Sequence, residues 1–182
     1  MSNFYISDIH GGHSNIIRLC NRPFKNVEEM NETYIRNHNA KVTNTDDVYF
    51  VGDIFFGKDV DGAIDFVKKL NGRKHLCIGN HDRKLMQNPE FRKLFIETKD
   101  EINVNDNGTK IVLHHCPLAE WEGYFRDTLH FYGHIHNNTD NLAYKLMKQV
   151  PNAYNLSCEI LGYTPRTLKE VIELNQKFQK EH

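Results

Sequence analysis

Short hydrophobic runs alternate with amphipathic stretches along the first half of the chain. Apolar and β-branched runs predict three strands, at residues 4–6, 48–51 and 75–78. Hydrophobic residues at helical spacing predict three helices, over about 26–39, over 61–70 and near 89–95. Asn26 with Glu29 three residues later resembles a capping box, which marks the start of the first of these helices.

In the second half of the chain, strands follow one another. The turn-forming segment 105–109 lies between two apolar runs and predicts a hairpin of strands at 101–104 and 110–113. A further strand is predicted at 129–132, and one or two more between residues 142 and 157. Thr164-Pro165 predicts the start of a closing helix. Its buried face would consist of Leu168, Val171, Ile172 and Phe178.

This order of elements predicts an α/β fold. Strands separated by helices, followed by consecutive strands, are typical of a mixed sheet arrangement covered by helices. The length of 182 residues corresponds to about one domain. No stretch has the composition of a linker, so we expect one domain over residues 1–182.

Composition excludes several classes of protein. Lys and Arg number 23 and Asp and Glu 24, so the net charge of −1 argues against a polybasic nucleic-acid or membrane-surface binder. No run of about 18 apolar residues predicts a membrane span, and the N-terminus lacks the pattern of a secretory signal. The four cysteines form no CxxC pair, which favours reduced thiols in a cytoplasmic protein. No sequence pattern specifies an oligomeric state.

The unusual number is 11 histidines, because imidazole is both a metal ligand and a proton donor near neutral pH. Many of them belong to polar clusters that directly follow predicted strands. These clusters are Asp8-Ile9-His10, Gly52-Asp53, Gly79-Asn80-His81-Asp82, His114-His115 and Gly133-His134-Ile135-His136. Each cluster alone could be an ordinary solvated turn. Because ligands bind beyond the carboxyl ends of strands in α/β sheets, five such clusters together predict one shared site.

The side chains in these clusters are suited to divalent metals. Imidazole with carboxylate and carboxamide oxygens fits Mn, Fe, Zn or Ni better than a thiolate-selecting site does. The candidate metal ligands are Asp8, His10, Asp53, Asn80, His115, His134 and His136. They are enough for two ions if one carboxylate bridges, and two adjacent ions can clamp a phosphoryl group.

In this order, the clusters resemble the calcineurin-like metallophosphoesterase superfamily, whose motifs are D-x-H, G-D, G-N-H-[DE], H and G-H-x-H. The resemblance runs from Asn3 to about Leu174. The segment 6–17, Arg22-Pro23-Phe24 and Gly162-Tyr163-Thr164-Pro165 are similar to the small stand-alone bacterial and phage members. The implied fold has two packed mixed β-sheets flanked by helices, a four-layer sandwich.

The resemblance also implies a role for each candidate ligand. The first metal would be held by Asp8, His10 and His136, the second by Asn80, His115 and His134, and Asp53 would bridge the two. His115 is preferred to His114 because the lone histidine of the family often precedes an aromatic-Pro pair, and Cys116-Pro117 follows here. In the other register, His114 and His115 exchange roles.

Four further residues are candidates for catalysis or substrate binding. The resemblance implies that His81 faces the substrate, stabilising the transition state or protonating the leaving oxygen. Asp82 would orient that loop or the imidazole, or it simply caps the loop. His13 and Arg83 could bind substrate, and the alternative for both is a solvent-facing side chain.

The implied activity is hydrolysis of phosphate esters by in-line attack of a metal-bridging hydroxide, with two divalent ions, Mn expected first. We expect small phosphodiesters or nucleotides as substrates. The D-x-x-D-R-G continuation of the phosphoprotein phosphatase branch is missing after Gly52-Asp53, which disfavours protein phosphatase activity. The alternatives are a nuclease that uses the same site and a non-catalytic metal-binding scaffold.

Overall fold

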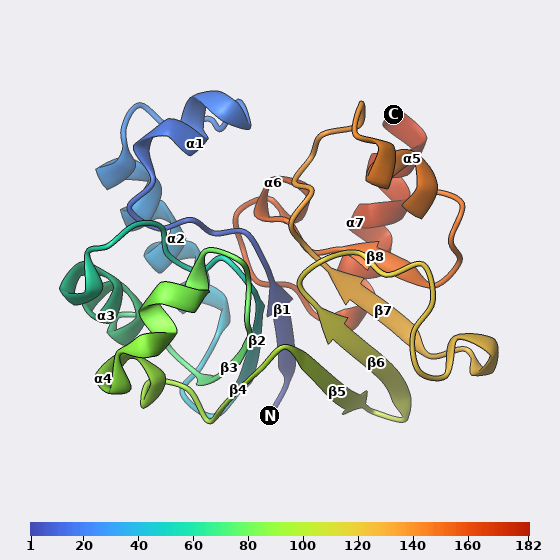
Figure 1. Cartoon of the computed structure of the whole chain (residues 1–182), viewed down its shortest axis with the longest axis horizontal. Coiled ribbons are helices and arrows are strands. Elements are labelled where there is room, and N and C mark those ends of the chain that lie inside the picture. The colour runs from blue at the N-terminus through green and yellow to red at the C-terminus, as the bar shows by residue number, and fades with distance from the viewer.

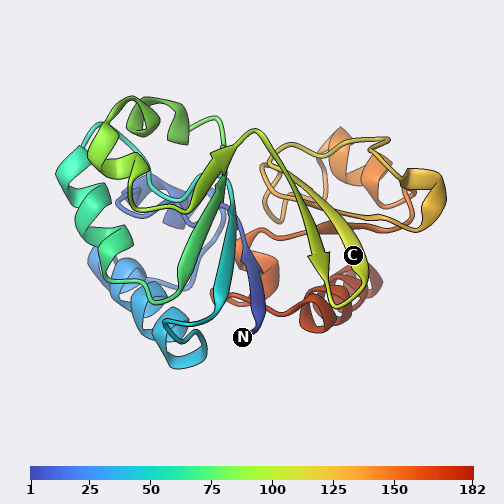
Figure 2. The ribbon, with the colours of Figure 1, turned by 90° about the horizontal axis from the view of Figure 1, so that it is seen from below.

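Two four-stranded sheets lie side by side, with helices on the outer side of each (Figures 1 and 2). The computed structural model describes all 182 residues of the chain. The first sheet contains β1 (Asn3–Ile6), β2 (Asp47–Val51), β3 (Arg73–Cys77) and β4 (Glu97–Lys99). These four strands are parallel and adjacent in chain order.

Helices connect the strands of the first sheet, as the alternation of patterns predicts. They are α1 (Ser14–Leu19), α2 (Val27–Lys41), α3 (Val60–Lys68), the 3₁₀ helix η1 (Asp82–Gln87) and α4 (Pro89–Arg92). The side chain of Asn26 caps α2 by accepting from the Glu29 amide at 2.8 Å. The Glu29 carboxylate accepts from Lys25 instead of Asn26, so only half of the predicted capping box forms.

The second sheet is mixed, as expected, whereas the first sheet pairs only parallel strands and so differs from the expectation of two mixed sheets. It contains β5 (Glu101–Asp106), β6 (Thr109–His114), β7 (Leu129–Tyr132) and β8 (Ala153–Asn155). β5 and β6 are antiparallel, and the remaining pairs are parallel. The predicted hairpin is confirmed. Its turn is Asn107-Gly108, where φ values of +53° and +91° fit a type I′ turn.

The helices around the second sheet include one, α5 (Leu142–Met147), that the sequence analysis did not predict. They are the 3₁₀ helix η2 (Tyr124–Arg126), α5, α6 (Cys158–Leu161) and α7 (Leu168–Glu181). The segment 142–157 contains one strand, β8, but begins with helix α5. Asn141 caps α5 and the helix buries Tyr144 and Met147, three residues apart. None of the helices is long and apolar enough to cross a membrane.

The sequence analysis did not predict the short elements β4, α1, η1, η2 and α6, and the closing helix starts later than expected. Strand β4 has three residues, all polar or charged, and so leaves no apolar run, whereas α1 is only six residues long and has no side-chain cap to mark its start. The closing helix α7 starts after Thr167 and not at Thr164-Pro165. Thr167 and Glu170 form a capping box, which satisfies the free amides at that end.

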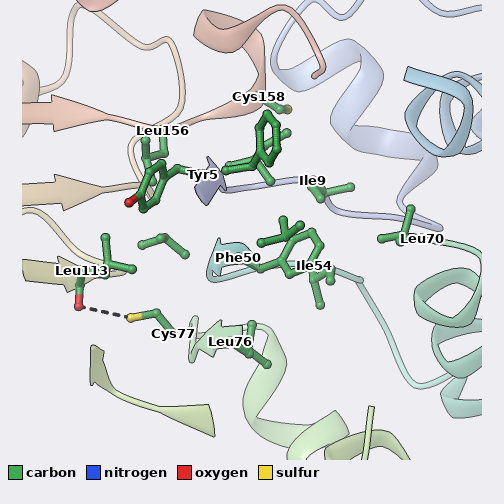
Figure 3. Close-up of a cluster of buried hydrophobic side chains, with 14 of the residues drawn as sticks. Tyr5, Ile9, Phe50, Ile54, Leu70, Leu76, Cys77, Leu113, Leu156 and Cys158 are labelled. Atoms are coloured by element: carbon green, nitrogen blue, oxygen red, sulfur yellow. Dashed lines mark hydrogen bonds between the residues drawn. The ribbon is translucent and has the colours of Figure 1, made fainter. Parts of the chain in front are cut away.

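The hydrophobic core joins the two sheets (Figure 3). A cluster of 33 buried residues includes side chains from both, and Tyr5 of β1 packs edge-on against Phe131 of β7 with ring centroids 5.1 Å apart. The Tyr5 hydroxyl donates to Asp106 of β5 at 2.8 Å, and the Cys77 thiol of β3 donates to the Leu113 carbonyl of β6. These contacts fix the sheets relative to each other, and with them the loops at their carboxyl ends.

The buried His130 makes the fold sensitive to acid. Its Nδ1 donates to the Val112 carbonyl and its Nε2 accepts from the Leu118 amide, each at 3.1 Å. The bond from the Leu118 amide requires a neutral Nε2, and burial lowers the pKa of His130 to about 4. The unfolded chain binds this proton near pH 6.5. We therefore expect His130 to decrease the free energy of unfolding by about 3 kcal/mol as the pH falls from 6.5 to 4.

Urea unfolding near pH 7 and near pH 4.5 tests this expectation. The decrease in unfolding free energy between the two conditions should be smaller in His130→Gln than in the wild type. The matched control is His182→Gln, because His182 is exposed at the end of α7. An equal decrease in all three proteins would rule out His130 as an acid-sensitive group.

Candidate metal centre

The backbone at this site adopts an unusual conformation. Five candidate ligands have left-handed φ values: Asp8 (+55°), His10 (+54°), Asp53 (+56°), His134 (+72°) and His136 (+52°). Such residues cost on the order of 1–3 kcal/mol each and gather at functional sites. They lie in the loops after β1, β2 and β7, and β1 and β7 both point toward the upper centre of Figure 1. The structure thus concentrates strained backbone where the five polar clusters meet.

Asp8, His10 and His136 form the first group. Their ligand atoms all lie within 4.8 Å of one another, and Nε2 of His136 is 3.8 Å from Oδ1 of Asp8. The rings of His10 and His136 stack with centroids 5.1 Å apart. Asp8 is held by the hydroxyls of Ser7 at 2.6 Å and Ser157 at 3.0 Å. The carboxylate therefore has a fixed position between the two sheets.

Asn80, His115 and His134 form the second group. Oδ1 of Asn80 lies 3.0 Å from Nε2 of His115 and 3.0 Å from Nδ1 of His134. The other ring nitrogen of His115 donates to the Val51 carbonyl at 2.9 Å, so Nε2 is the atom that faces Asn80. Three potential ligand atoms from three strand ends thus surround one point.

Asp53 lies between the two groups. Its Oδ2 is 3.6 Å from Nε2 of His10 and 3.4 Å from Nε2 of His115, and its Oδ1 accepts from the His81 amide at 2.9 Å. Close packing here requires glycine, since a Cβ at Gly52 would lie 2.1 Å from the His115 ring. The Asp53 carboxylate is therefore close to a ring nitrogen from each group.

The charges of the site fit cations. Burial opposes a proton on His115, but the hydrogen bond to Asp53 and the charge of Asp8 outweigh it and raise the pKa of His115 to about 9. Burial also opposes a proton on His136, but hydrogen bonds to Cys20 and Glu159 raise its pKa to about 11. The carboxylates thus favour positive charge on these rings, and divalent cations would replace the protons.

His10 supplies a second indication. Both of its ring nitrogens are buried and have no hydrogen-bond partner, and burial lowers the pKa of His10 to about 2. An unpartnered buried polar atom is costly. A metal ion on Nε2 would satisfy that nitrogen, so the donor set fits a metal.

The neighbouring residues His114 and His115 point in different directions. His115 points into the cluster, whereas Nδ1 of His114 donates to the Cys116 carbonyl at 2.8 Å. Adjacent residues of an extended segment face opposite sides, so only one of the two can reach Asn80.

Asp82 holds the backbone of the site. The side chain is fully buried, and its oxygens accept from the amides of Asp53 (2.8 Å), Gly79 (2.9 Å) and Ile54 (3.0 Å). Burial and the nearby charge of Asp53 raise the pKa of Asp82 to about 6. Its contacts join the loops after β2 and β3 and do not involve an imidazole.

The other predicted site residues lie at the edge of the cluster. His81 is exposed, and its ring centroid is 5.3 Å from that of His10. His13 stacks on Phe56 at 3.7 Å, and its ring is 5.6 Å from that of His10. Arg83 is mostly exposed and pairs with Asp100 at 3.0 Å, so its guanidinium is directed to a carboxylate outside the cluster.

Two buried residues that the sequence analysis did not select support the first group. Arg22 donates to the carbonyls of Ile9 (2.7 Å) and Asp8 (2.8 Å) and pairs with Oε1 of Glu159 at 2.8 Å. The same Glu159 oxygen accepts from Nδ1 of His136 at 3.1 Å. Arg22 had a weak signal, as part of the segment that resembles small bacterial and phage members. Glu159 had none.

Comparison with known proteins identifies similar sequences. The family model described as calcineurin-like phosphoesterase matches residues 4–107. An uncharacterized protein of Methanocaldococcus jannaschii is 35% identical over 179 residues, which are 96% of this chain and 91% of that protein. The Gene 66 protein of Mycobacterium phage L5 is 34% identical over 97 residues, 52% of this chain and 46% of the phage protein.

A solved structure shares the fold over almost its whole length. It is a protein of unknown function from Aquifex aeolicus, with a TM-score of 0.74 and 26% identity. The match covers 94% of this chain and 98% of the Aquifex chain. The two proteins therefore share the fold over nearly the whole of both chains.

Proposed function

Since the chain belongs to the calcineurin-like phosphoesterase family, we propose that it is a hydrolase of phosphodiesters or nucleotides that depends on two divalent metal ions. The observation that carries this proposal is the position of Asp53. Its carboxylate oxygen lies 3.6 Å from His10 and 3.4 Å from His115, between two groups of potential ligands.

In this proposal each group holds one ion. Asp8, His10 and His136 bind the first, Asn80, His115 and His134 bind the second, and Asp53 contacts both. Two bound divalent ions would supply a hydroxide nucleophile near neutral pH and offset charge on the phosphoryl oxygens. The mixture of imidazole and oxygen donors suits Mn first, with Fe, Zn or Ni as alternatives.

The residues around the ions position the substrate and move a proton. His81 is exposed next to His10 and would donate a proton to the leaving oxygen. Asp82 would hold the His81 loop in position beside Asp53, because its carboxylate accepts from backbone amides of both loops. The His13 ring lies 5.6 Å from the His10 ring, so in this proposal it contacts the bound ester as a substrate-binding residue.

Small substrates are favoured over large ones in this proposal. The near-neutral charge of −1 provides no broad basic surface for a polynucleotide. The four cysteines are free thiols, which supports a cytoplasmic location as part of the proposal.

The role of His81 can be tested through the leaving group. In His81→Ala with Mn²⁺, turnover of a phenyl phosphodiester should fall by about 100-fold, because phenolate is a poor leaving group that needs a proton. Turnover of bis(p-nitrophenyl) phosphate should fall less, since p-nitrophenolate leaves without one. The measurement is kcat for both esters.

The matched control is His114→Ala, because the His114 ring is bonded to the Cys116 carbonyl outside the cluster. Its kcat for both esters should stay at the wild-type level. Equal losses for the two esters in His81→Ala would remove His81 as the proton donor, and full activity would remove it from the chemistry altogether.

A further inference from the structure

A cavity of about 570 Å³ opens beside the candidate metal centre. Its walls are residues 19–21, at the end of α1, and the continuous segment 134–141 that follows β7. The second wall begins with His134 and His136, which belong to different groups of candidate ligands. A substituent on a phosphate bound at the centre therefore has a direct path into this cavity.

The cavity is rich in carboxamides. Asn21, Asn137, Asn138 and Asn141 all line it. Oδ1 of Asn138 accepts from the Asp140 amide at 3.1 Å, and Oδ1 of Asn141 accepts from the Ala143 amide at 2.8 Å. These bonds occupy the oxygens and leave the NH₂ groups as donors without a protein partner. The walls thus present donors for the oxygens of a polar ligand.

Charge excludes a second phosphate from this cavity. No Lys or Arg lines it, and apart from the candidate metal ligands His134 and His136 its only charged side chain is Asp140. The nearby Arg22 is fully buried and paired with Glu159, so it cannot reach a ligand there. A polyphosphate or a polynucleotide would place phosphates against a carboxylate with no compensating cation.

An apolar surface borders the carboxamides. Leu19 is 63% exposed on the α1 side of the cavity. Ligand sites commonly combine apolar contact for a ring with a few polar groups that fix its orientation. A nucleoside offers both a flat ring and oxygens that accept from amides.

We propose that this cavity binds the uncharged nucleoside part of a small nucleotide ester, with the phosphate at the metal centre. The proposal rests on the proposed phosphoesterase function, since the phosphate is the anchor. The base would lie against Leu19, and the sugar and base oxygens would accept from the carboxamides. Asn137 is the best probe because its side chain makes no hydrogen bond within the protein.

The hydrolysis test uses two esters that release the same leaving group. They are thymidine 5′-(p-nitrophenyl phosphate) and bis(p-nitrophenyl) phosphate, assayed with Mn²⁺. Wild-type kcat/KM should be about 10-fold or more higher for the thymidine ester. The ratio should fall toward unity in Asn137→Ala and in Asn21→Gly, which permits the left-handed backbone of Asn21 (φ +47°). The matched control is Asn44→Ala, in an exposed turn, which should keep the wild-type ratio.

A binding test does not depend on turnover. Calorimetry on the Mn²⁺-loaded protein should show tighter binding of thymidine 5′-phosphate than of inorganic phosphate, and Asn137→Ala should reduce the difference. Equal affinities would overturn the proposed nucleoside site. A higher kcat/KM for p-nitrophenyl phosphorylcholine than for the thymidine ester would also overturn it, because Asp140 would then be selecting a cation.

The two proposals fail in different ways. Hydrolysis of bis(p-nitrophenyl) phosphate without a preference for the thymidine ester would overturn the nucleoside site and leave the phosphoesterase function standing. Preferential binding of thymidine 5′-phosphate without hydrolysis of any ester would support the cavity and overturn the phosphoesterase function.

Discussion

Asp53→Asn should lower the hydrolysis of bis(p-nitrophenyl) phosphate by about 1,000-fold or more and reduce the bound metal from two ions to one. The carboxylate oxygen that lies 3.6 Å from His10 and 3.4 Å from His115 would become part of a neutral amide. An amide cannot bridge two cations as a carboxylate does. The measurements are metal content after gel filtration and kcat/KM in Mn²⁺.

The variant is expected to fold. Asparagine tolerates the left-handed φ of +56° at this position, and its Oδ1 can still accept from the His81 amide. Asp127→Asn is the matched control, because Asp127 has a similar φ of +58° but is an exposed residue after η2. Two bound ions and near-wild-type activity in Asp53→Asn would refute the bridging role.

Arg22→Met should weaken both the fold and metal binding. The substitution removes hydrogen bonds to the Asp8 and Ile9 carbonyls and leaves the Glu159 carboxylate buried without its guanidinium partner. Breaking a buried ion pair in this way costs about 3–5 kcal/mol of unfolding free energy. Loss of support for the ligands Asp8 and His136 should weaken metal affinity by about 10–100-fold. Urea unfolding of the metal-free protein and Mn²⁺ titration measure the two effects separately.

Two further variants make the result specific. Glu159→Gln in the Arg22→Met background removes a buried carboxylate that has lost its guanidinium partner and keeps only His136, so part of the lost stability should return, while metal affinity stays low. Arg36→Met is the control for losing an arginine, since Arg36 is exposed on α2 and bonds only to the Thr33 hydroxyl. If Arg22→Met matched Arg36→Met in stability and metal affinity, the buried pair would have no supporting role.

Features that depend only on residues close to each other in the sequence could be predicted. The Asn107-Gly108 turn forms because both residues tolerate positive φ, whatever the rest of the chain does. Asn26 caps α2 through an amide three residues away. By contrast, α5 was missed because its two buried residues face a small satellite core that only the folded chain assembles.

The supporting contacts of the site could not be predicted, because they join distant parts of the chain. Arg22 and Glu159 are 137 positions apart, and neither lies in a motif of candidate ligands. A buried ion pair of this kind depends on which loops the two sheets bring together. The cavity that we propose for a nucleoside likewise needs α1 and the loop after β7 to face each other.

The sequence alone determined the kind of chemistry. It placed carboxylate, carboxamide and imidazole side chains directly after apolar strands, and parallel strands bring such ends to a common edge. Only the tertiary structure decided which of these side chains meet. His115 faces Asn80 and His114 turns away, because the packing of β6 beside Gly52 sets the face of the strand that points inward. Residue type is a local property, whereas the neighbours of a side chain depend on how the whole chain packs.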